Sequence, residues 1–381
     1  MTAILAVAAC GPPPPTVSDW TPLPSPTGPE VDAVVFLVGD AGEALPGRSP
    51  VLAVLQREVE AWSSRLARDS AVSVVFLGDL VYPNGVHERG SPEFPRDSSR
   101  LRAQVDVLSG PVARRRGTRG IFLPGNHDWG QTTGAEGVAH LRNLEGLLAA
   151  MAEERGLGVG LLPPAGQPGP VALDVGDRLR LVLMDTQWWL RPHEDPWEAP
   201  IVRALGQALR TAGRREVIIA AHHPFLSGGP HGGPTPFWKG LGLLYVLRRS
   251  GALIQDVNSP PYRALLVGLR EIFEESGRPL LWAGGHDHSL QVLEGWSDDQ
   301  PRWSVVSGAG SKLTGVSGAR GMLYGASRPG FMRVTLLENG EAQLHVYAGR
   351  DGICEEDGPL LDRCMEEGVA GFHVVWARRL Q

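Results

Sequence analysis

Five apolar runs, spread along the chain, each end in a small residue that is followed by Asp, Asn or His. They occupy residues 34–42, 72–82, 121–128, 217–224 and 280–288. Short runs rich in Val, Ile and Leu are typical of strands that are buried on both faces of a sheet. The pattern therefore predicts five buried strands, each of which delivers a polar side chain at its carboxyl end.

Segments with helical periodicity separate these runs. Between residues 50 and 68, apolar residues such as Val51, Leu55 and Trp62 recur at helical spacing. After a polar loop at 84–98, further helices are predicted over residues 99–113, 136–153, 198–212 and 260–275. Further strands are predicted over residues 171–175, 179–185, 303–306, 331–337, 342–347 and 373–376. This order predicts an α/β fold in which two sheets pack together and helices cover the outside.

The composition narrows the classes of partner. The 381 residues are 42% hydrophobic, which is enough for a large core, and they carry a formal net charge of -6 at pH 7. Proteins that bind nucleic acid usually carry a concentrated basic charge, so nucleic acid is not an expected partner. The 49 glycines and 32 prolines indicate many loops between short strands, where functional residues are commonly placed.

The first 30 residues differ in composition from the rest. Residues 1–10 are small and apolar, and residues 7–10 are similar to a bacterial lipobox, whose cysteine, here Cys10, becomes the lipidated first residue. The segment lacks Lys and Arg and is shorter than a normal signal peptide, so a lipoprotein would need a start further upstream. An apolar tail without function is the alternative. Residues 11–30 are rich in proline and would form a stiff tether.

These features predict the organisation and location of the chain. We expect residues 1–30 to be a signal remnant and tether, and residues 31–381 to form one folded domain. We expect an exported bacterial protein, either a cell-envelope lipoprotein that meets a membrane only through Cys10 or a periplasmic or extracellular protein. The oligomeric state is open.

Cys354 and Cys364 flank an acidic stretch that is predicted to be a polar loop. In an oxidising compartment the two residues would close a short disulfide loop, whereas in a reducing one they would stay thiols. Both alternatives stay open at the level of sequence. A zinc site is not expected here because no second Cys or His pair is nearby.

The polar residues at the strand ends form a set of metal donors. They are Asp40, Asp79, Asn126, His222, His286 and His288. In open α/β sheets, ligands collect at the carboxyl ends of the strands, so these side chains are expected at one site. One Gly-Asp pair alone would be only a turn or a helix cap, but the whole set indicates metal. Imidazole and carboxylate together suit iron, zinc or manganese better than calcium, which takes oxygen ligands.

The order of these motifs resembles the calcineurin-like metallophosphoesterase superfamily and, within it, the purple acid phosphatases of the small tartrate-resistant type. The matching motifs are Asp-x-Gly at 40–42, Gly-Asp-x-x-Tyr at 78–82, Gly-Asn-His-Asp at 125–128, His-x-Pro at 222–224 and Gly-His-x-His at 285–288. Residues 307–310 are also similar to a family segment. The resemblance implies a four-layer α/β/β/α metallophosphoesterase sandwich, with a dinuclear metal centre at one edge of a catalytic domain formed by residues 31–381.

The resemblance also implies how the donors divide between two ions. Asp40, Tyr82 and His288 would bind one ion, Asn126, His222 and His286 would bind the other, and Asp79 would bridge them. A phenolate stabilises a ferric ion, so Tyr82 indicates Fe(III) beside Fe(II), Zn or Mn. The alternative for Tyr82 is a tyrosine that only packs in the loop.

The expected reaction is hydrolysis of phosphate monoesters in which metal-bound hydroxide is the nucleophile, as in an acid phosphatase. His127 is expected to contact the phosphate or to protonate the leaving group, and Asp128 to orient the His127 ring or to raise its pKa. His231 lies in a loop similar to one of the small purple acid phosphatases, which implies a role as proton donor or substrate-binding residue, and His223 is expected to assist substrate binding. His127 could instead only support its loop, and His231 could be a solvated loop residue.

Three alternatives for the function stay open. A phosphodiesterase or a nucleotidase would use the same metals with a different pocket. The distinguishing feature would be basic residues near a terminal phosphate, for which Lys239, Arg248 and Lys312 are candidates. A surface protein that only binds would keep the fold without turnover. The expected substrate is a phosphorylated small molecule or another phosphoester.

Overall fold

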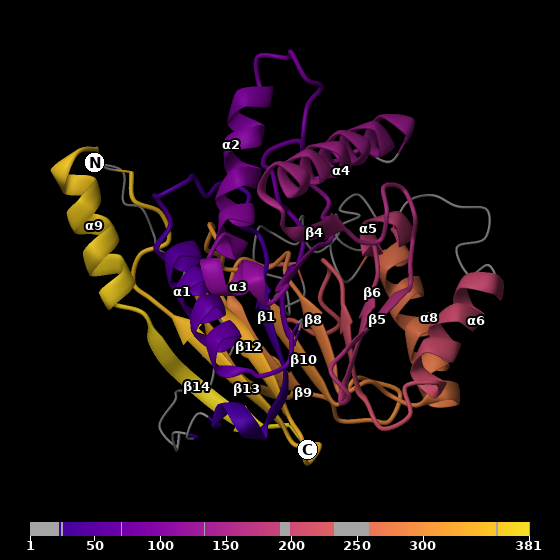
Figure 1. Ribbon diagram of the computed structural model, residues 1–381. Coiled ribbons are helices and arrows are strands. Elements are labelled where there is room, and N and C mark those ends of the chain that lie inside the picture. The colour runs from indigo at the N-terminus through magenta and orange to yellow at the C-terminus, as the bar shows by residue number, and fades with distance from the viewer. Residues whose placement is uncertain are drawn as a thin grey trace, which may run out of the picture.

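The apolar runs form the central strands of two packed sheets (Figure 1). The computed structural model describes residues 23, 26–69, 71–132, 134–190, 199–231, 259–355 and 357–380. Cys10 and nearly all of the expected signal remnant and tether lie outside the described residues.

The first sheet holds seven strands among the described residues, in the order β14-β13-β12-β1-β2-β3-β4. Their bounds are β14 (His373–Arg379), β13 (Ala342–Ala348), β12 (Gly330–Leu337), β1 (Val31–Val38), β2 (Val72–Phe76), β3 (Arg119–Phe122) and β4 (Gly158–Leu161). Strands β1 to β4 pair in parallel, and β12 pairs antiparallel with β1. The carboxyl ends of β1, β2 and β3 therefore lie at the same edge.

The second sheet also holds seven strands among the described residues, in the order β11-β9-β10-β8-β7-β6-β5. Their bounds are β11 (Met322–Ala326), β9 (Leu290–Glu294), β10 (Trp303–Ser307), β8 (Leu281–Gly284), β7 (Glu216–Ala220), β6 (Leu179–Leu183) and β5 (Val171–Val175). Strands β6, β7, β8 and β10 pair in parallel. The ends of β7 and β8 point to one edge of this sheet.

Helices cover the outer face of each sheet (Figure 1). On the first sheet lie α1 (Pro50–Arg65), α2 (Phe94–Val105), α3 (Pro111–Arg115) and α4 (Ala135–Arg155), with the short 3-10 turns Gly28–Glu30 and Asp106–Leu108 nearby. On the second lie α5 (Thr186–Trp189), α6 (Ala199–Arg210) and α8 (Pro260–Ser276). The predicted four-layer α/β/β/α sandwich is therefore confirmed.

Alternation along the strands builds the three cores between these layers. In β1, Phe36 packs toward the helices of the first sheet, while its neighbours Val35 and Leu37 pack between the two sheets. All eight residues of β1 are buried. A strand that is buried on both faces reads as a continuous apolar run, which explains why the sequence pattern is so clear here.

The predicted helix over residues 99–113 is wrong in its extent. The structure begins α2 at Phe94, with Pro95 in its first turn, and ends it at Val105. A 3-10 turn follows, and Pro111 then starts the separate helix α3. Pro has no N–H to donate to the preceding turn and is favoured at the first position of a helix, so the Gly110-Pro111 pair divides the segment. Three short strands, β4, β9 and β11, were not predicted.

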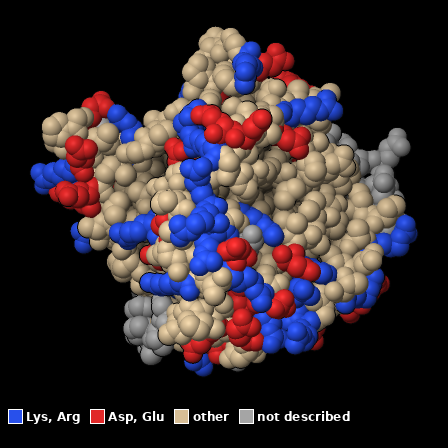
Figure 2. All heavy atoms as spheres, viewed as in Figure 1, with Lys and Arg blue, Asp and Glu red and all other residues tan. Residues whose placement is uncertain are grey.

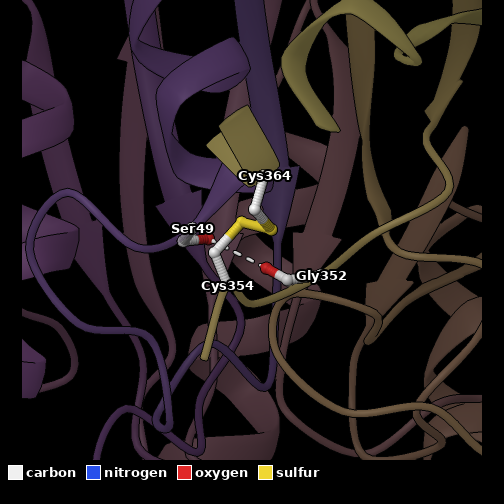
Figure 3. Close-up of a disulfide and its surroundings, with 4 residues drawn as sticks. All are labelled: Ser49, Gly352, Cys354 and Cys364. Carbon is white, nitrogen blue, oxygen red and sulfur yellow. Dashed lines mark hydrogen bonds between the residues drawn. A yellow bond between two sulfur atoms is a disulfide. The ribbon is translucent and has the colours of Figure 1, made fainter. Parts of the chain in front are cut away.

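The interpretation of residues 354–364 as a polar loop is also wrong in part. Cys364 lies on a helix, α9 (Pro359–Ala370), and it forms a disulfide with Cys354. Figure 3 shows this bond beside Ser49, where α1 begins, and Ser49 Oγ donates to the carbonyl of Gly352 at 3.4 Å. Helix α9 was missed because it buries little apolar surface: Leu360 is 62% exposed.

The surface agrees with the modest net charge. On the face seen in Figure 2, basic and acidic side chains are interspersed and form no single large basic area. Among the described residues, no helix has both the length and the apolar character needed to cross a membrane.

Candidate metal centre

The carboxyl ends of the central strands of both sheets meet at one edge of the sandwich. The Gly39 N–H, just after β1, donates to the carbonyl of Ser307 at the end of β10 at 2.7 Å, which joins the two sheets there. Beyond these strand ends lie the loops that carry Asp40, Asp79, Asn126, His222 and His286. The topology therefore gathers the polar residues that follow five separate apolar runs.

One group of donors comprises Asp40, Tyr82 and His288. The Tyr82 hydroxyl donates to Asp40 Oδ1 at 3.1 Å and lies 3.2 Å from His288 Nε2. His288 Nε2 is 3.4 Å from Asp40 Oδ1. A carboxylate, a phenol and an imidazole thus converge within one coordination sphere.

A second group comprises Asn126, His222 and His286. Asn126 Oδ1 lies 2.9 Å from His222 Nε2 and 3.2 Å from His286 Nδ1. The two imidazole nitrogens are 3.3 Å apart. His222 Nδ1 contacts the carbonyl of Leu77 at 2.8 Å, which orients the ring so that Nε2 faces the group.

Asp79 lies between the two groups. Its Oδ1 is 3.4 Å from His222 Nε2 in the second group. In the first group, Asp40, Asp79 and His288 offer ligand atoms that all lie within 4.8 Å of one another. Asp79 thus has close partners in both groups, as a bridging ligand requires.

The backbone is strained where three of these donors attach. Asp40, Asp79 and His286 have φ values of 58°, 53° and 67°. Residues other than glycine seldom adopt this left-handed conformation, and such residues cluster at functional sites. A structural role alone would not need three of them in one cluster.

Glycines allow the loops to come this close. A Cβ on Gly125 would lie 2.3 Å from Asp79 Oδ1, and a Cβ on Gly285 would lie 2.5 Å from Asp40 Oδ2. Any side chain at these two positions would occupy the space of a candidate ligand.

Opposing electrostatic effects act on the cluster. Burial raises the pKa of Asp79, but the positive charges of His222 and His127 lower it further, so the net pKa lies below its ordinary value. Burial lowers the pKa of His222, whereas Asp79 and Asp40 raise it, and the net pKa is raised. The pKa of Tyr82 lies well above its ordinary value because of burial and the same two carboxylates. A bound cation would reverse this field and favour the phenolate.

The donor set fits metal ions of the predicted kind. The first group offers anionic oxygens and one imidazole, and the second offers two imidazoles and an amide oxygen. Asp40 and Asp79 are at most 1% exposed. Buried carboxylates are costly unless cations compensate them, and mixed nitrogen and oxygen donors suit iron, zinc and manganese. Asp40, Asp79, Tyr82, Asn126, His222, His286 and His288 would therefore hold the metals.

Asp128 has a different set of contacts from the one expected. Its carboxylate accepts from the backbone N–H groups of Leu80 at 2.9 Å, Val81 at 3.1 Å and Gly125 at 2.8 Å. It thus ties the Asp79 loop to the Asn126 loop, and these contacts do not orient the His127 ring. Burial and the negative charge of Asp79 raise the pKa of Asp128 to about 8.

The His127 ring is oriented by a backbone carbonyl instead. Its Nδ1 lies 2.6 Å from the carbonyl of Pro83, and its Nε2 lies 3.9 Å from Asp79 Oδ2. The ring packs edge-on against Tyr82, at 4.5 Å between centroids. His127 Nε2 therefore faces the cluster, while the ring stays partly open to solvent. The sequence carries no signal for the contact with Pro83.

The loop that carries His231 is attached to Asp287, which lies between the candidate ligands His286 and His288. The His231 N–H donates to Asp287 Oδ1 at 3.0 Å, and the Ser227 hydroxyl donates to Asp287 Oδ2. The Gly228 N–H donates to Gln291 Oε1 at 2.7 Å. These contacts place the His231 ring against the His286 ring, at 4.4 Å between centroids and tilted by 40°. Sequence reasoning missed this anchoring role of Asp287, Ser227 and Gln291.

His223 is buried more deeply than expected for a residue that contacts substrate. It is fully buried, and its Nδ1 contacts the Thr186 hydroxyl at 2.8 Å. Together with His222 and His286, it forms a further group whose ligand atoms lie within 4.8 Å of one another. His223 therefore supports the imidazoles of the second group, and Thr186, which no sequence motif indicated, fixes its ring.

Comparison with known proteins identifies the fold. No protein-family model matches the chain, and no curated protein does. Among solved structures, GAP50, described as the anchor in the inner membrane complex of Plasmodium, matches with a TM-score of 0.57 and 16% identity, over 92% of this chain and 89% of that one.

Two further solved structures also match, one of them a purple acid phosphatase. Purple acid phosphatase PPD1 from yellow lupin (Lupinus luteus) seeds has a TM-score of 0.56 and 14% identity, over 93% of this chain and 54% of that one. PhoD has a TM-score of 0.52 and 11% identity, over 93% of this chain and 73% of that one. This chain thus spans about half of the lupin structure. The likeness confirms the predicted calcineurin-like metallophosphoesterase fold.

Proposed function

We propose that this protein is a metal-dependent phosphoesterase that hydrolyses phosphate monoesters. The observation that carries the proposal is the meeting of two donor groups, one around Tyr82 and one around Asn126, with Asp79 between them. Two ions at such a spacing would withdraw charge from the phosphate oxygens and acidify a water molecule.

The side chains around the metals have separate tasks in this proposal. His127 Nε2 faces the cluster from a partly exposed ring, so it is suited to bind the phosphate group or to protonate the leaving oxygen. His231 packs against His286 and is suited to the same task. Asp128 acts on the backbone and keeps the Asp79 and Asn126 loops together.

We propose iron for the ion beside Tyr82. The phenol lies within 3.2 Å of both other donors of its group, and an anionic oxygen ligand favours a ferric ion. The isolated protein should then absorb visible light, and Tyr82→Phe should lose that absorption. Elemental analysis of both proteins gives the metal content. A colourless, iron-free protein that is active would contradict the assignment and would favour zinc or manganese.

The decisive experiment compares monoester and diester substrates with purified, metal-loaded protein. We expect p-nitrophenyl phosphate to be hydrolysed faster than bis(p-nitrophenyl) phosphate. Asn126→Ala should lower turnover on the order of 100-fold because it removes a donor and displaces the rest. His373→Gln, which changes an exposed histidine on β14, is the matched control. Faster hydrolysis of the diester would favour the phosphodiesterase alternative.

A second candidate function is binding without catalysis. One protein with this fold is described as an anchor, so the fold alone does not establish turnover. The binding alternative predicts that the protein has no activity with either ester after loading with iron, zinc or manganese. It also predicts that Asn126→Ala folds normally and leaves all measured properties except metal content unchanged.

We also propose that the protein is exported. The disulfide between Cys354 and Cys364 supports an oxidising compartment, and the residues near Cys10 support a lipid anchor. Expression from a start upstream of Met1, in a bacterium supplied with labelled palmitate, tests the anchor. Label should enter the wild type and should be absent from Cys10→Ala.

A further inference from the structure

The loop that follows β10 places an ammonium group beside the metal-capable cluster. Of the 36 Lys and Arg residues, only Lys239 and Lys312 are lysines, and Lys239 lies outside the described residues. Lys312 Nζ lies 3.7 Å from the centroid of the Tyr82 ring. The hydroxyl of that ring contacts Asp40 and His288. The tasks proposed above do not use this cation.

The backbone on both sides of Lys312 is attached to loops that carry candidate ligands. The Ser311 hydroxyl donates to the carbonyl of Asp40 at 2.6 Å. The Thr314 N–H donates to the carbonyl of His288 at 2.8 Å. The position of Lys312 is therefore coupled to the loops of Asp40 and His288, two candidate ligands of the first group.

Besides the Tyr82 ring, the Lys312 ammonium has a weakly held acidic partner. Lys312 Nζ lies 3.0 Å from Glu43 Oε1, and the two side chains are 30% and 36% exposed. Exposed ion pairs contribute between zero and about 1 kcal/mol. Lys312 can therefore leave Glu43 for a more highly charged anion at little cost.

Lysine has properties here that arginine would lack. Its ammonium is a compact charge on a flexible stem and can turn from one partner to another. Arg100 also lies near the cluster, but its Nη1 donates to the carbonyl of Tyr82 at 2.6 Å. Arg100 thus holds the loop, whereas the Lys312 side chain extends from an attached backbone over the Tyr82 ring.

We propose that Lys312 binds a non-bridging oxygen of the substrate phosphate and so favours monoesters over diesters. This inference rests on the proposed function. A monoester phosphate near neutral pH carries about two negative charges on three acceptor oxygens. A diester carries a single charge, and esterification removes one of those oxygens. The additional charge and oxygen of the monoester match an additional cation beside the metals.

The test compares Lys312→Met with the wild type, because methionine keeps an apolar stem on the Tyr82 ring without the charge. Calorimetric titration of the metal-loaded proteins with inorganic phosphate should show an affinity loss of about 10-fold to 100-fold, the range for a hydrogen bond to a charged group. The kcat/KM for p-nitrophenyl phosphate should fall by a similar factor. The kcat/KM for methyl p-nitrophenyl phosphate should change by less than about 3-fold, as expected for a weak, screened contact.

Two further variants keep the result interpretable. Glu43→Gln removes the carboxylate that pairs with Lys312, so phosphate affinity should stay equal or increase. Lys312→Arg keeps the positive charge and should retain part of the phosphate affinity. Metal content and thermal unfolding show whether Lys312→Met keeps its cluster and its fold. Unchanged phosphate affinity in Lys312→Met, or equal losses of kcat/KM with the two esters, would overturn the proposal. If the wild type hydrolyses neither ester, the proposed function fails, while the phosphate titration still decides whether Lys312 binds the anion.

Discussion

Glycines determine how closely the candidate ligands approach one another. Gly125 precedes Asn126, and its backbone faces the carboxylate of Asp79, which lies on a different strand end. Asp79 itself holds a left-handed conformation with φ of 53°. The position of its carboxylate is thus determined by backbone geometry on both sides.

Substitution of Gly125 tests this geometry directly. In Gly125→Ala the new methyl group would lie 2.3 Å from Asp79 Oδ1, so the carboxylate must move. Because small displacements at a reacting site are costly, we expect turnover of p-nitrophenyl phosphate to fall on the order of 100-fold. Gly146→Ala is the control, since a Cβ there meets no described atom within 4 Å. Equal activity in the two variants would contradict the prediction.

His345 offers a test of acid sensitivity away from the cluster. It is 1% exposed on β13, and burial and the charge of Arg333 lower its pKa to about 3. The unfolded chain binds a proton at this residue below about pH 6.5, whereas the folded protein does not until about pH 3. Stability is therefore lost as the pH falls between these values, by about 3 kcal/mol at pH 4.5.

The variant His345→Leu lacks this titration. Urea unfolding between pH 7 and pH 4.5 should show a smaller loss of the free energy of unfolding than in the wild type. All other groups titrate in both proteins, so the difference between them isolates His345. Parallel curves for the two proteins would show that the pKa of His345 is not lowered in the folded state.

Among the elements, α9 depends most on a covalent link. It buries only Gly368 among its described residues, against Pro50 at the start of α1. The Cys354–Cys364 disulfide and the Cys354 N–H, which donates to the carbonyl of Arg48 at 2.8 Å, attach it to the same place. The loop that leads from Asp40 to α1 ends at this attachment.

Removal of the disulfide should lower stability without removing the metal centre. The bond joins residues 10 positions apart, and closing a loop of that size stabilises a fold by about 3 kcal/mol in the chain-entropy treatment. In the double variant Cys354→Ser, Cys364→Ser, urea unfolding should show a free energy of unfolding lower by about 3 kcal/mol. The variant should keep the metal content of the wild type. An unchanged unfolding midpoint would show that packing alone holds α9.

Across the whole molecule, both sheets contribute residues to the one buried cluster of candidate metal ligands. The first sheet supplies Asp40, Asp79 and Asn126, and the second supplies His222 and His286. The His286 N–H donates to Asp40 Oδ2 at 2.9 Å across the two sheets. Ions bound at this point would therefore stabilise the packing of one sheet on the other.

Chelation should reveal this coupling. Metal at a thousandfold excess over its dissociation constant stabilises a fold by about 4 kcal/mol, so treatment with EDTA should lower the melting temperature and abolish turnover. Addition of iron, zinc or manganese should restore both. Asn126→Ala should show a smaller change in melting temperature than the wild type. A melting temperature that does not respond to EDTA would contradict a metal centre between the sheets.

The sequence was sufficient for most of the central strands, for the layers and for the polar residues that the structure brings together. Central strands are buried on both faces, so they appear as continuous apolar runs, and each run places its polar residue at the same end of a parallel strand. Short edge strands such as β4 and β11, and the exposed helix α9, were missed because elements that bury little surface leave a weak pattern.

Only the tertiary structure decided which partner each donor has. Asp128 binds backbone N–H groups 47 and 48 residues away, and His286 meets Asp40 across 246 residues. Lys312 was a candidate from its charge alone, and only the structure places it over the Tyr82 ring. Such contacts depend on how two sheets pack and on left-handed backbone at Asp40, Asp79 and His286. A local pattern of apolar and polar residues records the period of a strand, but it does not record the distance between two strands that meet only after folding.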